Sequence, residues 1–94
     1  MTKMTYKMPV VNMEATGRNI ESLMRARGLS VRDLQEILEF QTTYAVYKWI
    51  YGKSLPTVDN LFRLAVIFDV PVDSIIIVEE AYEITRFLPW DLSA

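Results

Sequence analysis

Residues 28–56 have the sequence GLSVRDLQEILEFQTTYAVYKWIYGKSLP, which predicts two short helices separated by a turn. The first of these helices opens at Ser30, because Ser30 and Asp33 have the spacing of a capping box in which Asp replaces the usual Glu. This helix is expected to end near Glu39. Its buried face is predicted to consist of Leu34, Ile37 and Leu38.

The second helix of this stretch is predicted to span about residues 43–51. Thr42 or Thr43 can cap its first turn, and Gly52 follows its last residue. Apolar residues recur at i, i+3 and i+4 and belong to the predicted core: Val46, Trp49 and Ile50. Polar and aromatic side chains fall mainly on the other face: Thr43, Tyr44, Tyr47, Lys48 and Tyr51.

Further helices are predicted on both sides of this pair. One runs from Asn12 or Met13 to Arg27, another spans residues 58–68, and a short fifth helix covers about residues 72–76. The spacing of apolar residues predicts the buried positions of the two longer helices: Met13, Gly17, Ile20, Leu23, Met24, Leu61, Leu64, Ala65 and Phe68.

The ends of the chain have different patterns. Residues 1–11 are predicted to be an extended arm, since Pro9 blocks an early helix. Residues 79–87 show a partly helical pattern, and a helix closed by Pro89 is favoured there. A chain of 94 residues allows one domain, so the expected division is an arm (1–11), a helical domain (12–78) and a C-terminal extension (79–94).

The composition argues against an enzyme. The chain has no His and no Cys, so it lacks the commonest general base, the thiolate nucleophile and the usual metal ligands. No metal site and no cofactor are expected. No apolar stretch reaches the roughly 18 residues of a membrane span, so no contact with a membrane and a cytoplasmic location are expected.

Charge is distributed unevenly along the chain. The net charge is −2, but residues 1–63 carry +3 and residues 64–94 carry −5. A basic front and an acidic back suit a chain that presents one face to a polyanion. Chance segregation of solubilising charge explains the observation equally well.

The order and spacing of these pieces resemble the Cro- and lambda-repressor-like helix-turn-helix proteins, also called the XRE type. The likeness covers residues 15–78. The motifs that carry it are Gly28-Leu29-Ser30, Asp33-Leu34, Ile37-Leu38, Tyr47-Lys48-Trp49, Gly52-Lys53-Ser54-Leu55-Pro56, Asp59-Asn60-Leu61, Leu64-Ala65 and Val70-Pro71-Val72-Asp73-Ser74-Ile75-Ile76. The sequence departs from the family at Val31, where Gln is usual, at Glu39, where the turn usually has Gly, and at Ile50, where Glu is usual.

The resemblance implies an all-α, compact five-helix domain that binds double-stranded DNA as a sequence-specific transcriptional regulator. Helix 43–51 would enter the major groove, where Thr, Tyr and Lys side chains can contact base edges. Lys53 and Ser54 are suited to the phosphate backbone. The predicted DNA-binding residues are Arg32, Thr42, Thr43, Tyr44, Tyr47, Lys48, Tyr51, Lys53 and Ser54.

Two questions stay open at this point. Outward tyrosines and an acidic pI near 5.0 also suit a protein-interaction module, such as an antitoxin-like or adaptor protein. The apolar C-terminal residues can either fold back onto the domain or form a homodimer that spaces two half-sites about 34 Å apart. We favour the dimer, and the residues concerned are Val10, Val11, Ile77, Val78, Tyr82, Ile84, Phe87, Leu88, Trp90 and Leu92.

Overall fold

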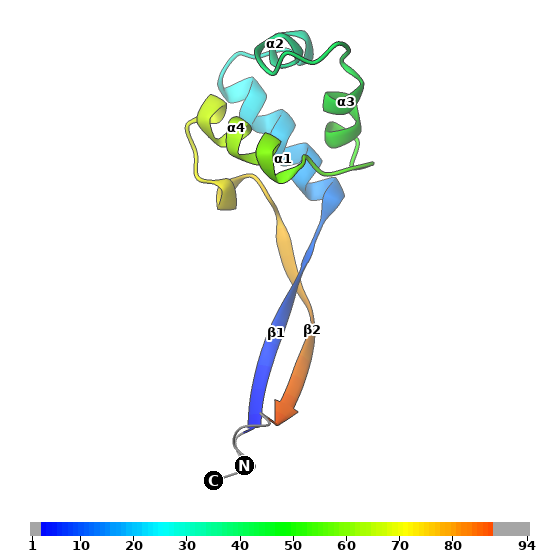
Figure 1. Ribbon diagram of the computed structural model, residues 1–94, viewed down its shortest axis with the longest axis vertical. Coiled ribbons are helices and arrows are strands. Elements are labelled where there is room, and N and C mark those ends of the chain that lie inside the picture. The colour runs from blue at the N-terminus through cyan, green and yellow to red at the C-terminus, as the bar shows by residue number, and fades with distance from the viewer. Residues whose placement is uncertain (1–2, 88–94) are drawn as a thin grey trace.

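A computed structural model describes residues 3–87 of the chain. A unit of short helices stands at one end, and a two-stranded ribbon projects from it (Figure 1). The molecule measures 59 × 22 × 20 Å along its principal axes. In chain order the elements are β1 (Lys3–Val11), α1 (Met13–Ala26), α2 (Val31–Ile37), α3 (Tyr44–Ile50), α4 (Val58–Phe68), the 3₁₀ turn η1 (Val72–Ser74) and β2 (Val78–Phe87).

The helices begin where the capping residues predicted. The Asn12 side chain accepts a hydrogen bond from the Ala15 N–H at 2.9 Å, and the Thr57 hydroxyl accepts one from the Asn60 N–H at 3.3 Å. At α2 both halves of the capping box form between Ser30 and Asp33. Each cap satisfies backbone donors that the helix leaves without partners.

The prediction of an all-α fold with five α-helices is wrong. The part of the chain that the structure describes has four α-helices, the single turn η1 in place of the fifth, and a two-stranded antiparallel sheet. Residues 79–87, predicted to be helical, belong to β2 and pair with β1. The β-branched run 75–78 leads into this strand, and pairing with the distant β1 outweighs the weak helical pattern. Pro89 lies outside the described residues.

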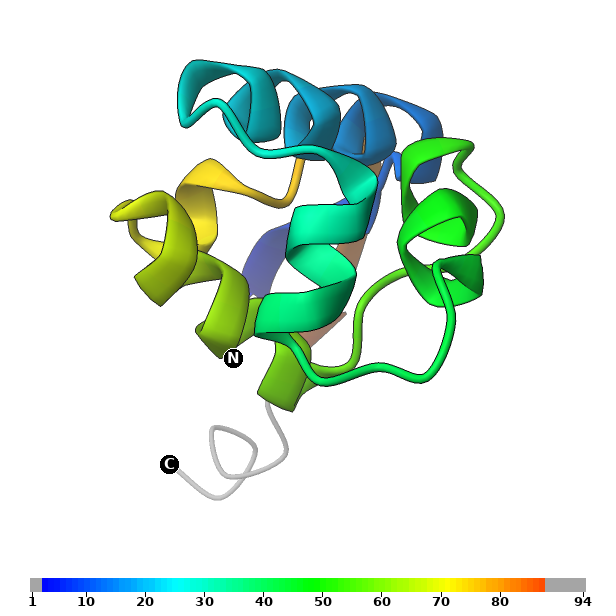
Figure 2. The ribbon, with the colours of Figure 1, turned by 90° about the horizontal axis from the view of Figure 1, so that it is seen from above.

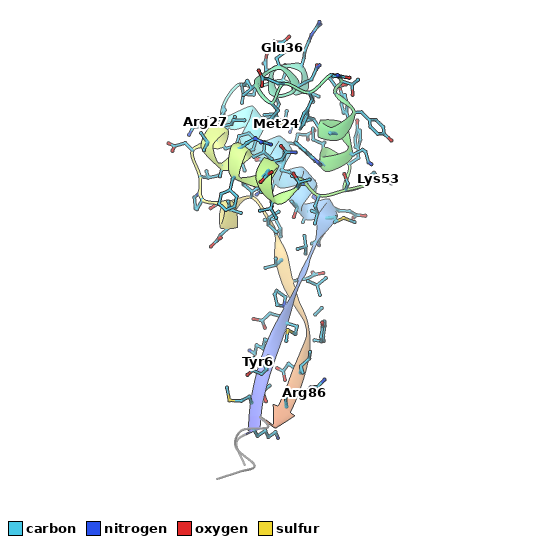
Figure 3. The ribbon with its side chains drawn as sticks, viewed as in Figure 1. Tyr6, Met24, Arg27, Glu36, Lys53 and Arg86 are labelled. Carbon is cyan, nitrogen blue, oxygen red and sulfur yellow. The ribbon has the colours of Figure 1, made fainter. Side chains whose placement is uncertain are left out.

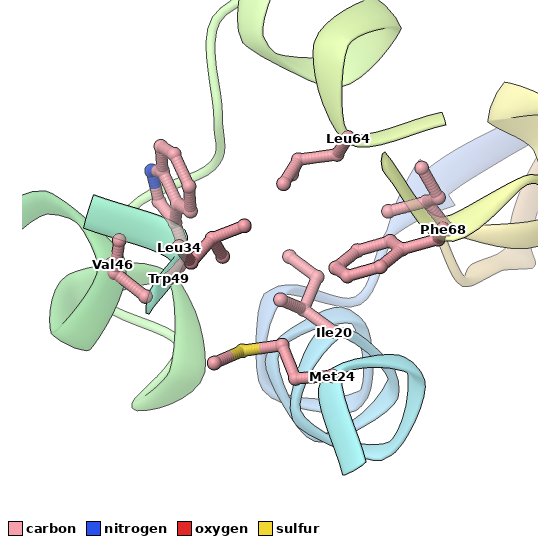
Figure 4. Packing of buried hydrophobic residues seen from close by; sticks show 8 residues of the cluster. Ile20, Met24, Leu34, Val46, Trp49, Leu64 and Phe68 are labelled. Atoms are coloured by element: carbon pink, nitrogen blue, oxygen red, sulfur yellow. The ribbon is translucent and has the colours of Figure 1, made fainter. Parts of the chain in front are cut away.

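The core lies between α1, α2, α3 and α4. Seen from above, α3 and α4 stand on opposite sides of α2, and α1 runs along a third side (Figure 2). Side chains from all four helices meet in the centre (Figure 4). The buried apolar residues are Ile20, Met24, Leu34, Val46, Trp49, Leu64, Phe68 and Ile75.

Two residues predicted to be buried are exposed. Met13 is 42% exposed and Ile37 is 51% exposed. Each lies at an end of its helix, Met13 at the first residue of α1 and Ile37 at the last residue of α2. Periodicity places both on the apolar face, but within residues 3–87 the packing leaves these helix ends largely open to solvent, so the prediction for them is wrong.

Polar side chains of α1 attach the ribbon to the helical unit. The Thr16 hydroxyl is buried and accepts the Ile77 N–H at 2.9 Å. The Asn19 amide donates to the carbonyl oxygens of Ser74 at 2.6 Å and Ile75 at 3.0 Å. The Asn12 N–H donates to the Ile77 carbonyl at 2.8 Å. These bonds fix the path of the chain as it enters β2.

None of the helices within residues 3–87 is long and apolar enough to cross a membrane.

Candidate nucleic-acid interface

The N-terminus of α3 is formed by the turn that precedes it. Thr42, and not Thr43, supplies the side-chain hydrogen bond, because its hydroxyl accepts the Tyr44 N–H at 3.2 Å. Thr43 occupies the N-cap position without such a bond. Its side chain is half-buried, whereas Thr42 is exposed.

The outward face of α3 carries aromatic side chains. Tyr44 is 68% exposed, Tyr47 is 42% exposed, and Tyr51, just beyond the last turn, is 65% exposed. The Tyr47 and Tyr51 rings stack with their centroids 5.9 Å apart and an interplanar angle of 11°. The Lys48 ammonium lies 5.3 Å from the centre of the Tyr44 ring, within the range of a cation–π contact. The face therefore presents hydroxyl groups, ring surfaces and one cation.

The chain turns sharply after α3 and brings more polar groups to the same end. Gly52 has a φ of 69°, a left-handed conformation that glycine adopts without strain. The N–H groups of Lys53 and Ser54 both donate to the Lys48 carbonyl, at 2.8 and 3.3 Å. This turn leaves Lys53 exposed at the edge of the helical unit (Figure 3).

Arg32 differs from the other predicted residues because it lies on α2. Its guanidinium Nε is 3.8 Å from the Glu36 carboxylate one turn along the helix. Both side chains are largely exposed, so the pair is weak and can open. The remaining predicted residues all come from α3 and its two flanking turns, so the structure groups them along one continuous segment, residues 42–54.

Gln41 and Arg27 are not among the predicted DNA-binding residues, and the structure gives them different positions. Gln41 is exposed in the turn before Thr42, and a Gln amide can donate to and accept from an adenine edge. In the sequence, its position next to Thr42 and Thr43 was the sign that it could belong to the site. Arg27, by contrast, donates to the Phe68 carbonyl at 3.1 and 2.9 Å, so it holds the end of α4 (Figure 3).

The turn between α2 and α3 has a strained residue. Glu39, at the position where the family resemblance implies glycine, adopts a φ of 59°. A left-handed conformation costs a non-glycine residue about 1–2 kcal/mol. Glu39 lies in the connection between the end of α2 at Ile37 and the start of α3 at Tyr44.

Close contact between α1 and α3 fixes the position of the interface. A Cβ on Gly17 would collide with the backbone carbonyl oxygens of Trp49 and Ile50. Gly17 therefore allows the last turn of α3 to lie directly against α1. The buried Val46 and Trp49 side chains hold the opposite side of the helix, so its outward face is fixed.

The acidic side chains of the helical unit include one carboxyl group whose pKa is lowered. The capping hydrogen bond from the Ser30 backbone N–H, and then the Ser30 side chain, lower the pKa of the Asp33 carboxyl. Within residues 3–87 no cluster of three His, Cys, Asp or Glu side chains is placed to hold a metal ion.

Comparisons with known proteins agree with the fold of the helical unit. The family model described as Helix-turn-helix matches residues 20–75. The chain is similar to two solved structures, the crystal structure of the DNA-binding domain of BldD and the structure of the S. venezulae BldD DNA-binding domain. Each superposes with a TM-score of 0.59 at 23% identity over 69% of this chain, and the match covers 93% and 96% of those chains. No curated protein matches.

Proposed function

We propose that this chain, which belongs to the XRE-type helix-turn-helix family, is a sequence-specific regulator of transcription that places α3 in the major groove of double-stranded DNA. The observation that carries the proposal is the outward face of α3, where exposed Tyr side chains and the half-buried Lys48 lie on a helix whose opposite side is buried. A helix of this width fits the major groove, where base edges are exposed.

The residues of the interface take different roles in this proposal. Tyr44, Tyr47 and Lys48 contact base edges, because their hydroxyl and ammonium groups lie on the face that enters the groove. Thr42, Thr43 and Tyr51 lie at the two ends of the helix and contact the sugar–phosphate backbone or the flanking bases. Phosphate contacts also come from Arg32, Lys53 and Ser54.

Binding of a random-sequence duplex, measured by fluorescence anisotropy at ~50 mM salt, tests this function. We expect measurable affinity that falls steeply as salt is raised, since phosphate contacts release counterions. Selection of bound duplexes from a random pool should then recover one motif. Negligible binding at low salt contradicts the proposal, and binding without an enriched motif contradicts its sequence specificity.

A protein-interaction module is the second candidate, and one observation favours it. The outer face of α4 carries apolar side chains one turn apart that are largely exposed: Val58 at 67%, Phe62 at 62% and Val66 at 81%. Exposed apolar patches often mark protein contacts. If this candidate is correct, substitution of Phe62 by Ser abolishes capture of the partner, whereas Tyr47→Ala leaves it unchanged.

We also propose that the chain acts as a homodimer through its C-terminal tail. The described part of the tail pairs with the N-terminal arm in the ribbon, away from the helices (Figure 1). Its apolar residues therefore remain available to a second copy. Leu88, Trp90 and Leu92, which belong to the predicted interface, lie outside the described residues. Sedimentation of the full chain at ~100 μM tests the dimer, and a monomer at this concentration contradicts it.

A further inference from the structure

One face of the ribbon formed by β1 and β2 is mainly apolar, and the other, called the polar face below, carries most of its charged and hydroxyl side chains together with Pro9, Val11, Val78 and Phe87. Directly paired residues of antiparallel strands point to the same face, and every second residue along a regular strand shares it. The extra residue Ala81 interrupts β2 opposite the step from Met8 to Pro9, so the alternation along β2 shifts by one residue there. On the polar face the Thr5 and Thr85 hydroxyls are 3.2 Å apart, and Lys7 forms an ion pair with Glu80 at 3.8 Å. The apolar face consists of Met4, Tyr6, Met8, Val10, Tyr82 and Ile84.

The apolar face is not covered within the part of the chain that the structure describes. No helix packs along the ribbon, which projects into solvent (Figure 1). Tyr6 is 40% exposed and Tyr82 is 54% exposed. A two-stranded ribbon alone in water is marginally stable, so covering this face contributes to keeping the strands paired.

Two opposite charges flank the apolar face. Arg86 pairs with Met4 near the free end of the ribbon, and Glu79 pairs with Val10 near the helical unit. Both side chains therefore project on the same side as the apolar residues. Six pair positions separate them, roughly 20 Å, which is too far for an ion pair within one copy. Neither forms an ion pair with another residue of 3–87.

We propose that a second copy of this chain covers the apolar face with its own, and that the two ribbons run antiparallel about a two-fold axis at the Lys7–Glu83 pair. In this arrangement Arg86 lies opposite Glu79 of the second copy at both ends of the interface. Between them, Ile84 faces Tyr82 of the second copy and Tyr6 faces its Met8, so the centre is apolar. This inference rests on the proposed homodimer and gives it an orientation.

Charge complementarity selects this arrangement over the others. A parallel arrangement brings Arg86 close to Arg86 of the second copy and Glu79 close to Glu79, and like charges in contact are unfavourable. DNA is not the occupant that the charges favour, because three cations of the ribbon are balanced by three anions. These six residues are Lys3, Lys7, Glu79, Glu80, Glu83 and Arg86.

A charge-exchange cycle on the full chain tests the orientation. We expect Glu79→Arg and Arg86→Glu each to raise the dimer Kd about tenfold, because each replaces two attractive contacts by two repulsive ones. The double variant E79R/R86E restores the pairs between copies, so its dimer Kd should return to that of the wild type. Sedimentation equilibrium without DNA gives the three values.

Mixing the two single variants sharpens the test. The Glu79→Arg variant has cations at both positions 79 and 86, and the Arg86→Glu variant has anions at both. The mixture should therefore form a heterodimer in preference to either homodimer. Lys3→Glu is the matched control. It changes the net charge by as much as Arg86→Glu, at the neighbouring pair but on the polar face, and should leave the dimer Kd unchanged.

Each result decides the inference. Restoration in the double variant and a preferred heterodimer support the antiparallel ribbon pair, since residues 79 and 86 of one copy cannot meet. A dimer whose Kd does not respond to either single variant, or is not restored in the double variant, overturns the orientation and leaves the proposed homodimer standing. A full chain that stays monomeric overturns both, while the DNA-binding proposal is tested separately by anisotropy.

Discussion

In the proposed function, single residues on α3 and in the turn after it make different kinds of contact with DNA. Lys48 lies on the outward face beside the Tyr44 ring, whereas Lys53 stands beyond the helix in an exposed turn. A contact to a base edge depends on the sequence of the duplex, but a contact to a phosphate does not. The two lysines should therefore respond differently to substitution.

We expect Lys53→Ala to weaken binding about equally on all duplexes and to lower the salt slope by roughly one, because one phosphate contact is lost. Lys48→Ala should change the selected motif as well as the affinity. Lys7→Ala, on the ribbon, is the matched control and should change neither. Anisotropy titrations over a range of salt and a repeated selection provide the measurements. An unchanged motif and affinity in Lys48→Ala contradict a role of α3 in base recognition.

The capping box of α2 gives the chain a pH-dependent term in stability. Because the pKa of Asp33 is lowered in the folded state, its capping contribution is complete above the ordinary aspartate pKa and is lost as the pH falls through the folded value. We expect Asp33→Asn to lower the thermal midpoint at pH 7 and this difference to shrink in acid. Calorimetry of both proteins across the acid range measures it. A constant difference at every pH contradicts the assignment.

At the scale of elements, the fold depends on how closely α1 and α3 approach. Gly17 meets the carbonyl groups at the end of α3, and Thr16 and Asn19 on the same helix bind the segment that leads into β2. Helix α1 thus positions both α3 and the ribbon. A change on α1 should act on binding without touching DNA.

We expect Gly17→Ala to destabilise the fold by about 1–3 kcal/mol, because the added methyl forces backbone atoms of α3 to move. DNA affinity should fall as well, measured under conditions where the variant is folded. Gly28→Ala is the control, since a Cβ there meets no atom within 4 Å and only its φ of 68° is unfavourable. Chemical denaturation and anisotropy give both quantities. Equal stability of Gly17→Ala and wild type contradicts the close packing of the two helices.

The whole molecule is long because its ribbon extends away from the helical unit. Nine residue pairs form the ribbon, which at ~3.3 Å per residue is about 30 Å of the 59 Å length. If two copies overlap their ribbons fully and antiparallel, their helical units stand at opposite ends, roughly 60 Å apart. This separation exceeds the single helical turn of about 34 Å that the family resemblance implies.

We therefore expect the two half-sites of a selected operator to be separated by about two turns of DNA rather than one. Duplexes in which two copies of the selected half-site are spaced from roughly 10 to 24 base pairs apart allow the affinity to be compared at each spacing. The tightest binding should fall near two turns. An optimum at one turn contradicts the extended dimer and supports a dimer whose two helical units lie side by side.

The sequence alone predicted where the helices α1, α2 and α4 begin and which side of α3 is buried. The start of α4 at Val58 and its end at Phe68 are as predicted, and Asn12, Ser30 and Thr57 cap their helices. The burial of Val46 and Trp49 leaves the predicted polar and aromatic face of α3 outward. These features follow from hydrogen bonds and contacts between residues three or four positions apart, which the sequence displays directly.

Only the tertiary structure decided the rest. Whether residues 79–87 form a helix or a strand depends on β1, whose Thr5 lies 80 positions away from its partner Thr85. The exposure of Met13 and Ile37 depends on which elements cover the helix ends, and the need for glycine at position 17 depends on the approach of α3. Strand pairing and helix packing join residues that are distant in the chain, so local periodicity carries no information about them.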